Sequence, residues 1–324
     1  MTAARTSTPN AAPHAAAVDE ERREPMLRGI SQSVKDRALP LLRPGNTNCG
    51  GCGMSIGLNF LSRAIGSRPV EMVIPACCGI VTAGPYPYSA YGAPVAASAF
   101  ASAAAVATGL AHVARLNGEQ TRVICWAGDG GTYDIGMATL SAAAERDEDI
   151  LYICYDNEIY GNTGGQRSSA TPLGAVTSTT PRGKTGGKKD ILAIMAAHRI
   201  PYAASISLAH PADADRKMRH ALDVTGFRFL HILSPCPTGW KSEPAEGIEL
   251  VRLAVASGLY PVIEVFGGRE IEVNVEPSFD HGALERYFES QGRFRGTKDD
   301  LAAVKTAIAE QWDHLCRHSK GGVR

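Results

Sequence analysis

Residues 123–166 read VICWAGDGGTYDIGMATLSAAAERDEDILYICYDNEIYGNTGGQ and predict the centre of the fold. The stretch begins with an apolar, β-branched run at 123–126 that is typical of a buried strand. The strand leads into a Gly-rich turn, Gly128-Asp129-Gly130-Gly131. A small-residue helix from Ile135 to Arg146 and a second buried strand from Ile150 to Tyr155 follow. This order predicts a βαβ unit, whose ligands bind beyond the carboxyl ends of its strands.

The residues at that edge suit a phosphate and a metal ion. Glycines let the backbone approach a phosphate, and the N–H groups at a helix start favour negative charge. Asp129 and Asn157 offer the hard oxygen ligands that Mg²⁺ prefers. A Gly-rich turn alone would also fit a ligand-free βα connection, but Asn157 at the second strand end favours the site. The pair resembles the thiamine pyrophosphate motif, GDG followed by an asparagine, which implies Mg²⁺ held by Asp129, Asn157 and the Ile159 carbonyl.

Composition sets the broad class of the protein. The 324 residues are 44% hydrophobic, with a formal net charge of zero, so nothing indicates binding to nucleic acid or to a membrane surface. We expect a disordered tail at 1–24, an α/β cofactor-binding domain at 25–270, and a C-terminal packing arm and helix at 271–324. The first residues lack the continuous apolar core of a secretion signal, which predicts a cytoplasmic protein.

Eight cysteines in such a chain indicate metal or redox chemistry rather than disulfides. They stand at positions 49, 52, 77, 78, 125, 154, 236 and 316. Cys49 and Cys52 lie on a Gly-rich turn, but a zinc ribbon would need a second CxxC. One close pair with distant single cysteines suits a [4Fe–4S] cluster, which binds four thiolates. For Cys49 and Cys52 the alternative is that they are buried structural thiols. Cys125 and Cys154 lie within predicted strands, which favours apolar packing in the core for these two residues.

The remaining segments alternate between strand and helix patterns. From Met72 to Ala114 there are 43 residues without Asp, Glu, Lys or Arg, and we expect a helix packed against other backbones at 94–114. Helices are predicted at 55–64, 190–198, 211–225, 248–257 and 299–316, and strands at 70–74, 202–208, 229–233 and 260–266. The alternation predicts an α/β fold with a doubly wound, mostly parallel sheet. The basic run Arg182, Lys184, Lys188 and Lys189 predicts a solvated loop, with an acidic partner or coenzyme A as the alternative ligand.

Several long motifs together resemble one family. They are CGGC, a cysteine after the next strand, PYPYSAY, GDGGTYDIG, DNEIYGNTGGQRSSATPLGA, PRGKTGGKKD and SPCPTGW. In this order they are similar to the β subunit of pyruvate:ferredoxin oxidoreductase and related 2-oxoacid:ferredoxin oxidoreductases. The resemblance covers Pro40 to Gly267 and implies a sheet of the thiamine-diphosphate-binding type.

The resemblance also implies roles for individual residues. The [4Fe–4S] ligands would be Cys49, Cys52, Cys77 and Cys236; Cys78 is the alternative at the third position, and we favour Cys77. Asn162 would act catalytically, facing the thiazolium and the substrate carbonyl, and Thr163 would face a phosphate oxygen. The remaining cofactor-binding residues would be Gly128, Asp129, Gly130, Gly131, Asn157 and Ile159. A polar loop bonding only to itself is the alternative for Asn162 and Thr163.

The implied activity is thiamine-dependent oxidative decarboxylation of a 2-oxoacid, pyruvate first, to acyl-CoA and CO₂. Electrons would pass through the [4Fe–4S] cluster to ferredoxin or a similar acceptor. An α subunit would supply the glutamate that activates thiamine, and γ- or δ-type subunits would carry further clusters. Phenylglyoxylate, other 2-oxoacids or oxalate are alternative substrates. A non-redox thiamine decarboxylase would need no cysteine set, and a non-catalytic iron–sulfur carrier would need no GDG and asparagine.

Overall fold

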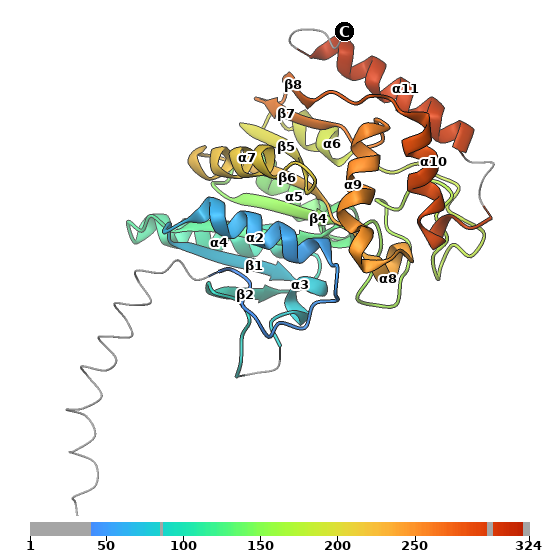
Figure 1. Ribbon diagram of the computed structural model, residues 1–324. Helices are drawn as coiled ribbons and strands as arrows, with labels where there is room; N and C mark the ends of the chain where they lie inside the picture. The colour runs from blue at the N-terminus through green and yellow to red at the C-terminus, as the bar shows by residue number, and fades with distance from the viewer. Residues whose placement is uncertain (1–39, 85–86, 297–300, 320–324) are drawn as a thin grey trace, which may run out of the picture. The chain divides into compact units, whose positions relative to one another are not determined.

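The computed structural model describes residues 40–84, 87–296 and 301–319, and these contain an eight-stranded sheet (Figure 1). Its order is β2-β1-β3-β4-β6-β5-β7-β8. The strands are β1 (Val70–Pro75), β2 (Val95–Ser98), β3 (Arg122–Gly128), β4 (Leu151–Asp156), β5 (Tyr202–Ser207), β6 (Arg228–Leu233), β7 (Val262–Phe266) and β8 (Glu270–Val275). The six strands from β2 to β5 in this order are parallel, whereas β7 runs antiparallel to both neighbours. The predicted α/β fold with a mostly parallel sheet is confirmed.

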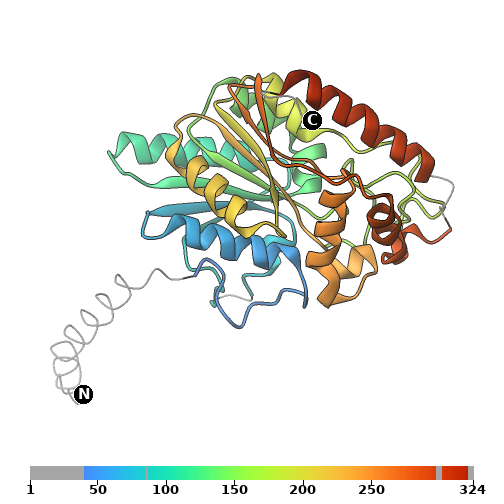
Figure 2. The same ribbon diagram turned by 45° about the horizontal axis from the view of Figure 1, so that its top comes forward.

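Helices cover both faces of the sheet (Figures 1 and 2). α2 (Gly53–Ile65) and α7 (Pro211–Asp223) pack on one face, and α4 (Ala103–Leu116), α5 (Met137–Glu145), α6 (Ile191–Ala197) and α11 (Leu301–His318) pack on the other. β4, β5 and β6 are buried along their whole length. Because both faces are covered, β4 is apolar as far as Asp156, and the polar side chains within β5 and β6, such as Ser205, Arg228 and His231, are buried with hydrogen-bond partners.

Shorter elements gather near the ends of β4 and β6. They are α8 (Pro237–Trp240), η2 (Pro244–Glu246), α9 (Gly247–Ala256), α10 (His281–Glu289) and η3 (Gly292–Phe294). A separate apolar cluster joins them and includes Trp240, Leu250 and Tyr287. This cluster connects the C-terminal part of the chain to the carboxyl ends of the parallel strands, which we call the carboxyl edge.

The expectation of one helix at 94–114 is wrong for its first part. Residues Val95–Ser98 form the edge strand β2, which pairs with β1, and the helix α4 begins only at Ala103. The segment is rich in alanine and carries little strand propensity, so pairing with β1 decides its conformation. The short helix α3 (Cys78–Val81) was not predicted either.

The C-terminal segment contributes to the sheet, because β8 pairs with β7 by a register from Val262↔Val275 to Phe266↔Glu270. The described residues belong to one compact unit, Pro40–Arg324. The tail expected at 1–24 lies outside the described residues. No helix among the described residues has the length and apolar character needed to span a bilayer.

Candidate functional site

The turn after β3 places Asp129 at the carboxyl edge. The chain continues into one π-helical turn, η1 (Gly130–Asp134), before α5, and such turns often occur at functional sites. Gly130 packs directly under the Tyr160 ring, because a Cβ at this position would lie 1.9 Å from Tyr160 Cε1. The Tyr160 hydroxyl donates to Asp134 at 2.6 Å, which fixes the ring over the turn. Asp129 is only 2% exposed.

The three oxygen ligands predicted for Mg²⁺ converge. The Asn157 side-chain amide has two orientations of nearly the same shape. With its nitrogen toward Asp129, the amide donates to Asp129 Oδ1 at 3.0 Å and to the Ile159 carbonyl at 2.6 Å. With the amide oxygen of Asn157 in that position, it faces Asp129 Oδ1 and the Ile159 carbonyl oxygen. Three acceptors then lie together, and a cation would compensate their repulsion. Octahedral ligands about 2.1 Å from Mg²⁺ lie roughly 3 Å from each other, so these three oxygen atoms fit the ion.

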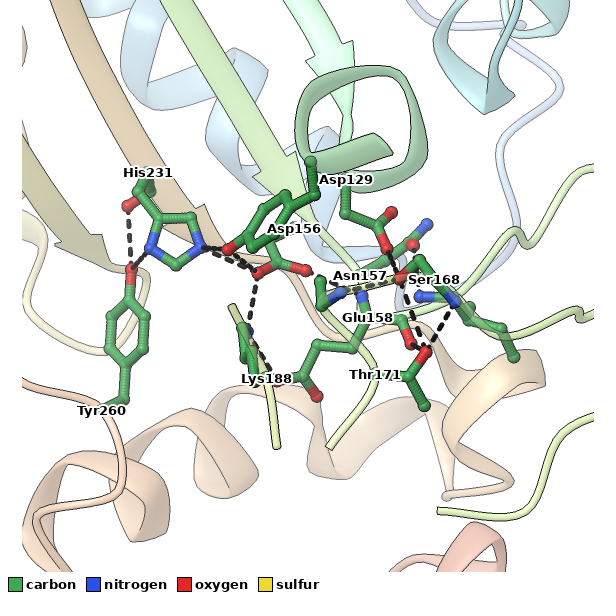
Figure 3. A network of polar contacts seen from close by, with 12 residues as sticks. Asp129, Asp156, Asn157, Glu158, Ser168, Thr171, Lys188, His231 and Tyr260 are labelled. Atoms are coloured by element: carbon green, nitrogen blue, oxygen red, sulfur yellow. Dashed lines mark hydrogen bonds and ion pairs between the residues drawn. The ribbon is translucent and has the colours of Figure 1, made fainter. Parts of the chain in front are cut away.

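Neighbouring hydroxyls orient this group. Ser168 Oγ donates to Asp129 Oδ2, and Thr171 Oγ1 donates to the Glu158 carbonyl at 2.7 Å (Figure 3). Burial raises the pKa of Asp129, and the charge of Asp156 raises it further. A bound cation would therefore relieve the repulsion that the ionised carboxylate experiences here.

A buried ionic network lies behind Asn157 (Figure 3). Asp156 is fully buried, and its Oδ2 accepts from Tyr133 at 2.8 Å and lies 2.8 Å from His231 Nε2. Lys188 Nζ lies 2.6 Å from the same oxygen and 2.9 Å from Glu158 Oε1. Glu158 has a positive φ of 64°. Lys188 therefore links the two carboxylates that flank Asn157.

The expectation that the basic run is solvated is wrong for two of its lysines. Lys188 bridges buried carboxylates, and Lys184 is buried and donates to three backbone carbonyls, of Ser169, Thr171 and Gly187. Lys189 donates to the Tyr133 carbonyl at 2.6 Å. Lys184 and Lys188 already bind acceptors within the chain, which leaves them unsuited to an external acidic partner.

Three separate segments bring cysteines to the carboxyl edge: the turn with Cys49 and Cys52, the adjacent pair Cys77–Cys78, and the turn with Cys236. The turn with Cys49 and Cys52 packs on the turn before Cys236, because the Gly53 amide donates to the Pro235 carbonyl at 2.9 Å. Burial raises the pKa of the Cys52, Cys78 and Cys236 thiols. The charges of their neighbours add to this: Cys236 and Cys49 act on Cys52, and Cys49 acts on Cys236. The thiols therefore lie close enough to interact.

The two adjacent cysteines have different surroundings. The charges of Cys77, Cys236, Cys52 and Cys49 all act on Cys78, whose pKa rises to about 12, mainly through burial. Cys77, which is half-buried like Cys78, instead forms a hydrogen bond with the Tyr155 side chain. Cys78 Sγ also approaches Gly161, where a Cβ would lie 3.6 Å from it. The charges of the other thiols therefore act on Cys78, whereas Cys77 faces the Tyr155 side chain.

Among the described residues, no three His, Cys, Asp or Glu side chains are arranged to hold a metal ion. A [4Fe–4S] cube binds each thiolate to a different iron, so its ligands are spaced more widely than those of one ion. A cluster would therefore require a different spacing of these thiols than a single zinc ion does.

A cavity of about 160 Å³ lies between the oxygen ligands predicted for Mg²⁺ and the Cys77–Cys78 pair, because both sets of residues line it. It is lined by Ala76, Cys77, Cys78, Phe100, Gly128, Asp129, Gly130, Gly131, Tyr155, Asn157, Ile159, Tyr160, Gly161, Asn162 and Thr163. Asn162 and Thr163 are exposed, and the Thr163 hydroxyl donates to Gln166 Oε1 at 2.5 Å. Thr163 must therefore exchange that bond for any phosphate contact.

Comparison with known proteins adds the family. Residues 79–232 match the model of the thiamine pyrophosphate enzyme, C-terminal TPP binding domain. The chain is 42% identical over 284 residues to ketoisovalerate oxidoreductase subunit VorB of Pyrococcus horikoshii, covering 84% of this chain and 91% of that protein. It is 40% identical over 282 residues to pyruvate synthase subunit PorB of Methanothermobacter marburgensis, covering 85% and 96%.

A solved structure has the same fold. It is a 2-oxoglutarate:ferredoxin oxidoreductase from Magnetococcus marinus, with a TM-score of 0.57 and 22% identity. The match covers 82% of this chain and 94% of that chain.

Proposed function

Because the chain belongs to the β subunits of the thiamine-dependent 2-oxoacid:ferredoxin oxidoreductases, which act with partner subunits, we propose that its carboxyl edge holds three cofactors. These are thiamine pyrophosphate, Mg²⁺ and one [4Fe–4S] cluster. The observation that carries the proposal is the single cavity lined both by Asp129, Asn157 and Ile159 and by the Cys77–Cys78 pair.

Asp129, Asn157 and the Ile159 carbonyl would hold Mg²⁺ against the pyrophosphate. Gly128, Gly130 and Gly131 line the cavity, which supports a role for the turn as a phosphate cradle, because glycines let the backbone N–H groups approach a phosphate. Asn162 at the cavity mouth would offer a neutral hydrogen-bonding group to the substrate carbonyl. Bound thiamine pyrophosphate supplies the electron sink for decarboxylation of a 2-oxoacid.

The cluster would be held by Cys49, Cys52, Cys78 and Cys236. The charges of Cys236, Cys52 and Cys49 that act on Cys78, and the separate bond between Cys77 and Tyr155, support this set. We therefore prefer Cys78 to Cys77, the residue favoured from the sequence. Because cluster ligands are thiolates, their raised pKa values mean that cluster binding would release protons. The cluster would carry electrons away from the thiamine site toward ferredoxin or a similar acceptor, with coenzyme A taking the acyl group.

The substrate would be a 2-oxoacid with one carboxylate, such as pyruvate or ketoisovalerate. Among the described residues that line the cavity there is no Lys, Arg or His to pair with a second carboxylate, and Ala76 and Phe100 offer apolar surface. The partner subunits would complete the pocket and provide the glutamate that activates thiamine.

The test is anaerobic purification of the complex with its partner subunits. We expect bound thiamine pyrophosphate, reduction of a viologen dye that depends on a 2-oxoacid and coenzyme A, and a loss of about four iron atoms per β subunit when Cys52 is replaced by alanine. Pyruvate, ketoisovalerate, phenylglyoxylate and oxalate would be compared, with the first two reduced fastest. A colourless complex, or one that reduces no dye with any of them, would refute the proposal.

A further inference from the structure

Two loops that would hold different cofactors touch each other at the carboxyl edge. The metal loop, residues 156–161, follows β4 and carries Asn157 and Ile159. The cysteine loop, residues 234–240, follows β6 and carries Cys236. At Gly239 the two are in contact, because a Cβ there would lie 2.8 Å from Ile159 Cγ2 and 3.2 Å from Cys236 Sγ. Neither loop can therefore move at this point without displacing the other.

Trp240 makes the polar link between the loops. Its indole Nε1 donates to the Asn157 carbonyl at 2.9 Å, and the side chain is fully buried. Since the same residue supplies the side-chain oxygen for Mg²⁺, this bond restrains the backbone from which that side chain projects. Trp240 also ends α8, which begins one residue after Cys236.

Arg293, in the C-terminal turn η3, fixes both Trp240 and the metal loop. Its guanidinium carbon lies 4.3 Å from the centre of the Trp240 ring, and Nη2 lies 2.7 Å from Glu158 Oε2. Gln291 accepts from its Nε at 2.8 Å. Arg293 is only 2% exposed, so its charge depends on these partners.

The contacts of Arg293 include an ion pair and a cation–π contact, in addition to apolar packing. A buried arginine is costly unless it is paired, and here it is paired with Glu158, a residue of the metal loop. A stacked arginine over tryptophan is a favourable cation–π contact. Both interactions end on the loops that carry cofactor ligands, and they come from a segment more than a hundred residues distant from the metal loop in sequence.

We propose that Arg293 is a positioning residue shared by the two cofactor loops, which acts through Glu158 and Trp240 to hold the Mg²⁺ ligands and Cys236 in register. The inference rests on the proposed cofactor sites. It assigns to the C-terminal turn a role at both of them, so disturbing Arg293 changes thiamine binding and the electronic properties of the cluster together.

The test compares Arg293→Met with Arg295→Met in the complex purified with its partner subunits. Arg295 is an exposed arginine two residues away and serves as the matched control. Outer contacts of metal sites change affinity by about 10- to 100-fold when removed. We therefore expect Arg293→Met to raise the Kd of thiamine pyrophosphate, at saturating Mg²⁺, at least tenfold by calorimetry. We also expect a shifted electron paramagnetic resonance spectrum and midpoint potential of the cluster, while Arg295→Met leaves all three unchanged.

Trp240→Phe is the second variant, in case Arg293→Met does not assemble. It keeps a ring beneath Arg293 but removes the bond to Asn157, and we expect a Kd about fivefold higher, as for one lost hydrogen bond. Two results would overturn the inference and leave the proposed function standing. One is a wild-type Kd for thiamine pyrophosphate in Trp240→Phe. The other is an assembled Arg293→Met complex in which thiamine binding, the cluster, or both are unchanged. A wild-type complex without thiamine binding or a cluster spectrum would refute the proposed function, and the inference with it.

Discussion

Replacing Lys188 by methionine would leave two buried carboxylates without their shared cation. Lys188 Nζ lies 2.6 Å from Asp156 Oδ2 and 2.9 Å from Glu158 Oε1. Methionine keeps much of the length and apolar character of the lysine stem but removes the charge. The variant therefore isolates the ionic contribution of the bridge from its packing.

The expected loss of stability follows from the burial of the partners. Removing one member of a buried ion pair costs about 3–5 kcal/mol, because the remaining charge has lost its compensation. The Lys188 side chain is 25% exposed, Asp156 keeps Tyr133 and His231 as partners, and Glu158 keeps its Arg293 contact. These facts place the effect at the lower end, about 3 kcal/mol, which corresponds to a melting temperature lower by roughly 6 °C.

The effect depends on pH in a defined direction. Burial alone would raise the pKa of Asp156, but Lys188 and His231 outweigh it, so the folded pKa lies below the ordinary value. Burial alone would lower the pKa of Lys188, but Asp156 and Glu158 outweigh it and raise the pKa. The Asp156 contribution is therefore complete above about pH 4 and is lost in stronger acid, and the Lys188 contribution is complete below about pH 10 and is lost in stronger base.

Thermal unfolding of the cofactor-free chain, by calorimetry between pH 3 and pH 9, would measure this. Lys189→Met is the control, because the Lys189 side chain is 45% exposed and such surface amines contribute about 1 kcal/mol or less. We expect the gap between Lys188→Met and the wild-type protein to be constant from about pH 5 to pH 9 and to narrow toward pH 3. A variant that unfolds within about 1 kcal/mol of the wild-type protein at pH 7 would show that the bridge does not stabilise this edge.

Three further outcomes are expected. Asp129→Ala should weaken Mg²⁺-dependent thiamine pyrophosphate binding at least tenfold, about 1.4 kcal/mol, and unaltered affinity in calorimetry would contradict the ligand assignment. Cys78→Ala should lower the iron content of the purified complex by about four atoms per β subunit, because the partner subunits keep their own clusters, whereas Cys77→Ala should leave it unchanged; the reverse pattern would restore Cys77 as the ligand. Gly130→Ala should destabilise the chain by about 1–3 kcal/mol, because the added methyl group would lie 1.9 Å from Tyr160 Cε1; a wild-type urea midpoint would argue against that close packing.

The sequence predicted the parts of the fold that local patterns encode. The strands on either side of the Gly-rich turn are short apolar runs bounded by turn residues, and both lie where expected as β3 and β4. Asp129 and Asn157 follow those strands, so parallel pairing of β3 with β4 brings them to one edge. The edge strand Val95–Ser98 was missed because it pairs with β1 without a strand-like composition.

The supporting contacts depend on long-range packing, and the sequence did not reveal them. The sequence around Lys188 is basic and typical of a solvated loop. Only the folded chain brings Lys188 against Asp156. Arg293 and Trp240 lie far apart in sequence, and although Trp240 ends the motif SPCPTGW, that motif does not indicate a contact with Arg293. The choice between Cys77 and Cys78 likewise depends on their surroundings, because Cys77 is extended and caps α3, whereas Cys78 begins that helix.

The contact between the turn at Cys49 and the turn before Cys236 has a consequence for biogenesis. Their meeting point, the bond from the Gly53 amide to the Pro235 carbonyl, requires β6 to be already paired beside β4. A ribosome-bound chain that lacks the second turn would present only part of the thiol set. Insertion of the proposed cluster would therefore follow synthesis and sheet formation, so the machinery that supplies iron and sulfide would encounter an almost finished subunit.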